Sequence, residues 1–222
     1  MSSTLEKVQQ SPLLVRVAPF AIFLVFTACQ GRFGDTSQYW LYLAKVIVGA
    51  WAIWLVRPFV PEMRWRASRE AVAVGVAVFA VWVALDPYYP KFTEGGLTWN
   101  PFATFPTNHA LAWLIVVGRI LGSTFVVPPL EEVLYRSFLY RYIIKPDFQT
   151  VPLNALKLGP FLITAAIFGF AHIEWLAGIL CAVAYHGLVI RKNRLGDAIV
   201  AHAVTNFLLG LWVLWKSDWH FW

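Results

Sequence analysis

The sequence has little charge. Asp, Glu, Lys and Arg make up 14% of its 222 residues, whereas hydrophobic residues make up 59% and tryptophan occurs 12 times. A soluble globular protein needs more polar surface than this composition supplies. The low charge excludes a soluble domain and predicts an integral membrane protein.

Cysteine is also scarce. The two cysteines, Cys29 and Cys181, lie within or at the end of apolar runs, where cysteine behaves as a small buried hydrophobe. This excludes the disulfide framework of a small secreted protein. Internal repeats and low-complexity tracts are absent as well, so residues 1–222 are predicted to form a single integral membrane domain.

Long apolar runs are abundant, and several approach the ~20 residues that a helix needs to cross ~30 Å of hydrocarbon. They cover residues 13–29, 39–56, 71–85, 110–127, 161–171, 175–190 and 198–215. None alternates as barrel strands do, so the sequence predicts an all-α polytopic membrane bundle of about seven to eight transmembrane helices. The first run lacks a small-residue cleavage site and is predicted to be retained as a span.

The net charge of +6 comes from basic residues that lie in loops beside the runs. This pattern is the orientation signal of membrane proteins, and it argues against a nucleic-acid partner. Residues 57–69 and 191–194 are predicted to be cytoplasmic, with the N-terminus on the same side and residues 86–108 outside. We expect a multi-pass protein of a bacterial inner membrane whose C-terminus lies outside.

Residues 109–144 must then make a single net crossing. One long helix broken at Pro128 and Pro129 satisfies this count, because proline removes a backbone donor and clashes with the preceding turn.

Three polar motifs interrupt the apolar C-terminal half. In "EEVLYR", Glu132 and Arg136 are four residues apart and can pair on one helix face. Glu131 lies about a quarter-turn away, which leaves this carboxylate to face something else. In isolation, the motif is equally explained by a structural ion-pair cluster.

The other two motifs use the same helical interval. "FGFAH" pairs Phe168 with His172, and "HAVTN" pairs His202 with Asn206. Helix-to-helix hydrogen bonding would explain each one singly. A rise of ~1.5 Å per residue nevertheless places Glu131, His172, His202 and Asn206 at similar depth, as an intramembrane site requires.

The residue types in the three motifs limit the catalytic mechanisms that the site could use. No serine nucleophile lies in these motifs, and Cys181 has no matched partner. A zinc site could use Glu131, His172 and His202, although the compact HExxH pattern is absent. The other arrangement is direct activation of water by a carboxylate and an imidazole, with neutral donors for the oxyanion and no cofactor.

The three motifs resemble the EExxxR, FxxxH and HxxxN motifs of the CAAX-protease and bacteriocin-processing family, relatives of the type II CAAX prenyl endopeptidase. The resemblance covers roughly residues 110–215, so residues 109–215 are predicted to be the protease-like core. The stretches "EWLAGIL" and "SDWHFW" further resemble a bacterial CAAX prenyl protease-related subgroup associated with exosortase-type sorting.

The resemblance implies an intramembrane endopeptidase in which Glu131 and His172 activate water. His202 and Asn206 would hold the oxyanion, while Glu132, Arg136 and Phe168 would support the site. Glutamate-type and metallo-type mechanisms both stay open at this point. A peptide or protein C-terminal segment is the implied substrate, and a sorting system is an implied partner.

Two other classes of function stay open. A non-catalytic membrane immunity or sorting accessory protein of the same family would use the polar cluster only to lock helices together. A transporter is a weaker reading, because the sequence has neither an inverted repeat nor paired broken helices.

Overall fold

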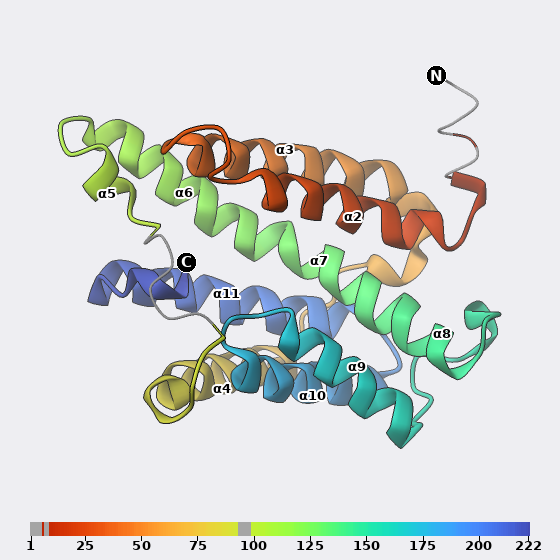
Figure 1. Cartoon of the computed structure of the whole chain (residues 1–222). Coiled ribbons are helices and arrows are strands. Elements are labelled where there is room, and N and C mark those ends of the chain that lie inside the picture. The colour runs from red at the N-terminus through yellow and green to blue at the C-terminus, as the bar shows by residue number, and fades with distance from the viewer. Residues whose placement is uncertain (1–5, 7–8, 93–98) are drawn as a thin grey trace.

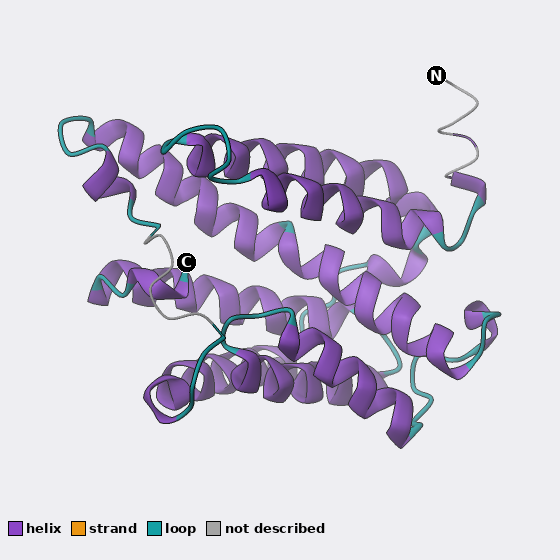
Figure 2. Ribbon diagram, in the orientation of Figure 1, coloured by secondary structure: helices purple, strands orange, loops and turns teal. Residues whose placement is uncertain are grey.

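The structure is a computed structural model that describes residue 6 and residues 9–92 and 99–222. Within these ranges helices are joined by loops and turns, and no strand occurs (Figure 2). The main helices are α2 (Leu14–Cys29), α3 (Ser37–Val56), α4 (Arg69–Leu85), α5 (Pro101–Thr104), α6 (His109–Phe125), α7 (Val127–Glu132), α8 (Tyr140–Ile144), α9 (Leu158–Phe170), α10 (Trp175–Lys192) and α11 (Gly196–Lys216). The all-α polytopic bundle predicted from the sequence is confirmed.

The helices begin and end where local signals allow. Ser68 precedes α4, and its hydroxyl accepts a hydrogen bond from the Ala71 amide. Asn108 caps α6 in the same way through the Leu111 amide, and Asn193 ends α10 in the left-handed conformation (φ 50°). Between these signals the apolar runs form helices, because a helix satisfies its own backbone hydrogen bonds in lipid.

Five helical segments within the described residues are long and apolar enough to cross a membrane. They are Ser37–Phe59, Arg69–Tyr88, His109–Ile144, Trp175–Lys192 and Gly196–Lys216. The helices α2 and α9 are apolar but shorter than the ~20 residues that an isolated span needs. Together these segments match the apolar runs of the sequence.

The helices form two groups joined by one long helix (Figure 1). In one group α2 packs on α3, and in the other α4, α9, α10 and α11 pack together. The helix that runs through α6, α7 and α8 contacts both groups, through α3 on one side and α11 on the other. Residues from both halves of the chain can therefore meet along it.

The long helix covers 36 residues and is continuous in direction but irregular in its hydrogen bonding. It is interrupted at Val126, just before Pro128 and Pro129, as the sequence predicts. A second irregularity is not predicted: the segment η4 (Val133–Leu139) is a π-helix. A π-helix is wider than an α-helix and often marks a functional site.

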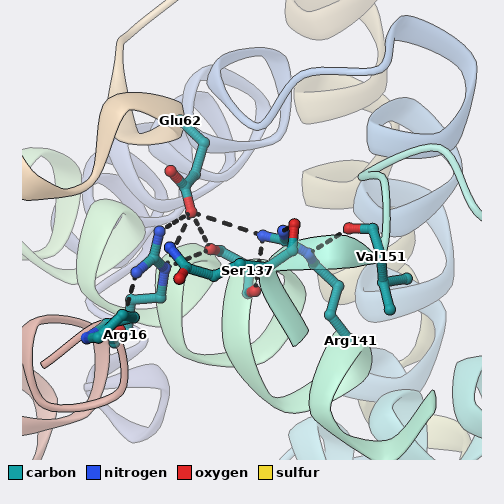
Figure 3. Close-up of polar contacts among 7 residues, drawn as sticks. Arg16, Glu62, Ser137, Arg141 and Val151 are labelled. Atoms are coloured by element: carbon teal, nitrogen blue, oxygen red, sulfur yellow. Dashed lines mark hydrogen bonds and ion pairs between the residues drawn. The ribbon is translucent and has the colours of Figure 1, made fainter. Parts of the chain in front are cut away.

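Side chains of the π-helix and of α8 are held by a buried polar cluster (Figure 3). Glu62 lies between two arginines, at 2.6 Å from Arg16 Nη2 and 3.7 Å from Arg141 Nη1. The Ser137 hydroxyl donates to the same Glu62 oxygen, and Arg141 Nε donates to the Val151 carbonyl at 2.8 Å. This cluster ties α2, the loop before α4 and the long helix together.

The two basic loops lie at the same end of the bundle. Lys192 Nζ is 2.7 Å from Glu70 Oε1, and Gly196 packs against the backbone of Arg64 and Arg66. Their common position agrees with the expectation that both loops lie on one side of the membrane. Residues 93–98, part of the loop expected on the opposite side, lie outside the described residues.

Candidate active site

The two carboxylates of the first motif lie at the end of α7, directly before the π-helix. Glu132 is fully buried, and its Oε1 is 3.1 Å from Arg136 Nη1, the pair that the spacing predicts. Glu131 is partly buried, and its Oε2 has no hydrogen-bond partner among the described residues. The adjacent carboxylates therefore have different surroundings.

His202 of α11 lies between these carboxylates. Its Nδ1 is 3.0 Å from Glu132 Oε1, and its Nε2 is 3.9 Å from Glu131 Oε2. Because an ionised carboxylate can only accept, a hydrogen bond at Nδ1 places a hydrogen on that nitrogen. Glu132 thus orients His202 as well as pairing with Arg136, a second contact that the spacing within one helix does not predict. Tyr185 stacks on the imidazole at 5.2 Å between ring centroids.

His172 lies just beyond the C-terminal end of α9. Its Nδ1 is 2.7 Å from the carbonyl oxygen of Phe168, which can only accept, so Nδ1 carries the hydrogen. In the neutral ring, Nε2 is then left with its lone pair and is able to accept a proton. Trp82 of α4 packs edge-on against the ring at 5.9 Å.

The Phe168 ring is buried and contacts both the Arg136 guanidinium and the His172 ring. The ring lies 4.5 Å from the Arg136 guanidinium carbon and 4.7 Å from the His172 ring. Tyr135 meets the ring edge-on at 5.0 Å. Phe168 covers the buried arginine and links the first motif to the second.

Asn206 lies one helical turn beyond His202 on α11. Its side-chain nitrogen donates to the Ser123 carbonyl of α6 at 2.8 Å. An amide nitrogen carries two hydrogens, so one donor is left for a ligand.

Two adjacent cavities connect these residues. The larger one, of about 580 Å³, is lined by Glu131 and His172. The smaller one, of about 170 Å³, is lined by His172, His202 and Asn206. Both are lined by Arg119, Ser123, Val127, His172 and Trp222. The four residues predicted to perform the chemistry therefore face one connected region.

The larger cavity is lined by residues from two parts of the chain. Glu131 and His172 come from the motif-bearing helices, whereas Phe23 of α2 and Tyr42 and Lys45 of α3 form the other side. The helices α2 and α3 thus complete the space around the predicted site.

The residues proposed for zinc do not form a three-ligand cluster. Among the described residues, the group of His, Cys, Asp and Glu whose ligand atoms lie within 4.8 Å of one another is Asp86, Glu174 and His220. Lys91 Nζ already lies 3.2 Å from Asp86 and 3.5 Å from Glu174 in that group. The geometry of Glu131, His172 and His202 therefore does not fit a zinc site.

Several residues around the site were not found by sequence reasoning. Ser123 acts through its backbone and Tyr185 through stacking, and neither leaves a signal in a motif. Arg119 and Lys45 do leave a signal in the sequence, since each is a single charge within an apolar run.

Residues 112–208 match the family model described as Type II CAAX prenyl endopeptidase Rce1-like. The match includes all three motifs and falls within the core predicted at residues 109–215. The helices α2, α3 and α4 lie outside it. Comparison with curated proteins gave no match, and neither did comparison with solved structures.

Proposed function

Because the chain belongs, through residues 112–208, to the type II CAAX prenyl endopeptidase Rce1-like family, we propose that it is an intramembrane endopeptidase that cleaves its substrate with a water molecule activated by Glu131 and His172. The observation that carries this proposal is the placement of Glu131 and His172 on one cavity.

In the proposed reaction, the water oxygen attacks the scissile carbonyl carbon while its proton passes to the Glu131 carboxylate or to His172 Nε2. The C–N bond then breaks, and the captured proton goes to the leaving amine. A general base of this kind contributes roughly 10²–10⁴-fold to the rate.

Negative charge develops on the carbonyl oxygen during the attack. The second amide hydrogen of Asn206 is able to donate to it. His202 Nε2 can donate to it as well when the ring carries both protons. Glu132 and Arg136 do not touch the substrate in this scheme, and they position His202 and the π-helix.

The test is cleavage of a reporter peptide library by the purified protein in lipid nanodiscs. Glu131→Gln and His172→Gln should each lose cleavage while they elute as the wild-type protein does. Full cleavage by Glu131→Gln would refute the mechanism. If the wild type cleaves nothing and both variants complement a deletion strain, the accessory-protein reading is correct.

The location follows from the same proposal. We propose a multi-pass position in a bacterial inner membrane with the basic loops and the N-terminus in the cytoplasm. The common end at which the two loops lie supports placing both loops on one side of the membrane. A peptide or protein C-terminal segment is the proposed substrate, and the subgroup resemblance adds a sorting system as the proposed source of that substrate.

A further inference from the structure

The larger cavity carries more positive than negative charge. Lys45 of α3 and Arg119 of α6 both line it, while Glu131 is the one carboxylate among its described lining residues. Charged side chains within a membrane span are expensive and mark functional pathways. The excess of positive charge needs an explanation beyond the proposed catalytic groups.

Arg119 has no acidic partner within the described parts of the chain, and its guanidinium makes no side-chain hydrogen bond there. It lies instead against three aromatic rings, at 4.3 Å from Trp99, 4.7 Å from Tyr42 and 5.4 Å from Trp222. Aromatic faces stabilise a guanidinium and leave its N–H donors available. A desolvated cation with available donors is suited to bind an anion.

Lys45 is held in a similar way. It is only 6% exposed, and its Nζ donates to Thr27 at 3.0 Å and to Gln30 at 2.9 Å. Both partners are neutral. The ammonium also lies 4.7 Å from the centre of the Tyr42 ring, the ring that Arg119 contacts. Two basic side chains therefore converge on Tyr42, and Glu131 is the one carboxylate among the described residues that line the cavity with them.

The position of this pair relative to Glu131 is set by the long helix. Arg119, Ser123, Val127 and Glu131 recur at intervals of four and all line the cavity. Twelve residues at ~1.5 Å each separate the Cα atoms of Arg119 and Glu131 by about 18 Å along the helix axis.

We propose that Arg119 and Lys45 form an anion-binding subsite for the free C-terminal carboxylate of the substrate peptide, on the same cavity as Glu131. The substrate class in this inference rests on the proposed function, whereas the anion subsite itself is read from charge and geometry. A lipid phosphate offers the same monoanionic chemistry, and the test separates the two.

The experiment measures binding rather than cleavage, on the Glu131→Gln protein in phosphatidylcholine nanodiscs. The probe is a dye-labelled heptapeptide of leucine and alanine, supplied as the free acid and as the C-terminal amide. We expect the acid to bind at least about tenfold tighter than the amide, as a charge-assisted contact supplies. In the Arg119→Gln/Lys45→Met protein the preference should fall below about twofold.

Matched variants control for folding and for total charge. Arg69→Gln removes an exposed positive charge at the start of α4 and should keep the full acid preference. Arg119→Lys keeps the cation and should retain most of the preference. Lys45→Met alone should reduce it about threefold, so the proposal is tested even if Arg119→Gln does not fold.

Equal affinities for acid and amide would overturn the subsite, and so would a preference that survives the double variant. Nanodiscs with phosphatidylglycerol provide the lipid arm. The cations would be assigned to a lipid headgroup instead if two results were found together. The acid and the amide would bind equally in phosphatidylcholine, and phosphatidylglycerol would abolish probe binding only in protein that contains Arg119. Acid-selective binding by a protein that cleaves nothing would contradict only the proposed protease function.

Discussion

His202 Nδ1 lies 3.0 Å from Glu132 Oε1. This contact joins α11 to the long helix at the point where the π-helix begins. It gives the buried Glu132 carboxylate a second partner besides Arg136 and directs the other ring nitrogen of His202 toward Glu131. The two neighbouring glutamates should consequently respond differently to the same substitution.

Glu131→Gln should lower the cleavage rate by about 10²–10⁴-fold with little change in the unfolding temperature, because its Oε2 holds no partner. Glu132→Gln should lower both the cleavage rate and the unfolding temperature, because it leaves the Arg136 charge buried without its carboxylate, at a cost of about 3–5 kcal/mol. Peptide cleavage and thermal unfolding in nanodiscs measure the two effects. Equal stabilities of the two variants would contradict this division of roles.

Phe168→Leu should destabilise the protein by about 2 kcal/mol beyond the loss of packing, because the Arg136 guanidinium loses its aromatic cover at 4.5 Å. Phe170→Leu is the matched control, since Phe170 lies on the same helix and is 55% exposed. Denaturant unfolding compares them. Similar losses for both would show that the ring over Arg136 contributes nothing specific.

Gly169→Ala should lower both stability and cleavage. A Cβ on Gly169 would lie 2.7 Å from the Trp175 carbonyl and 2.8 Å from the Ile179 amide, so α9 must move away from α10 and carry His172 with it. Gly187→Ala on α10 meets nothing within 4 Å and should stabilise the helix by up to about 1 kcal/mol. Unchanged activity in Gly169→Ala would mean that the close helix crossing does not position His172.

Stability should fall in acid through Glu62. Burial acts to raise the pKa of Glu62, but the charge of Arg16 and hydrogen bonds from Ser137 and Arg16 outweigh it, and the pKa is lowered from its ordinary 4.5. A carboxylate with a lowered pKa contributes stability that is fully present above pH 4.5 and is lost as the pH falls through the folded-state value.

Glu62→Gln should therefore be less stable than the wild type at neutral pH and less sensitive to acid. The exposed Asp147→Asn variant serves as the control. Unfolding followed from neutral pH to pH 3 tests this, and parallel acid profiles for wild type and Glu62→Gln would refute the assignment.

Chelators should leave the cleavage rate unchanged, because Glu131, His172 and His202 do not bring three ligand atoms within 4.8 Å. The measurement is cleavage after dialysis against a strong chelator, with and without added zinc. Activity that disappears and returns with zinc would favour the metal mechanism over the glutamate mechanism.

Much of this architecture is predictable from the sequence, for reasons that differ between features. The helices follow from apolar runs because lipid imposes closed hydrogen bonding on any span. The Glu132–Arg136 pair follows from an interval of four. The π-helix does not follow from the sequence of its own segment. Its wider turn is held by Ser137 and Arg141 through contacts with Glu62, which lies in a distant loop.

The surroundings of single charges were equally hidden from the sequence. Arg119 is visible as a charge within an apolar run, but its aromatic partners come from α3, from the segment before α5 and from the C-terminal end. Periodicity within one helix carries no information about such distant partners. For the same reason, the contact between His202 and Glu132 follows only from the packing of α11 on α7.

The larger cavity is lined by helices from inside and from outside the segment that matches the family. The groups assigned to bond cleavage belong to the matched segment, whereas Phe23 belongs to α2 and Tyr42 and Lys45 belong to α3. Relatives could therefore exchange one substrate for another by changing residues in α2 and α3, and the reaction would be inherited unaltered. Choice of substrate and chemistry would then evolve at separate rates within one small protein.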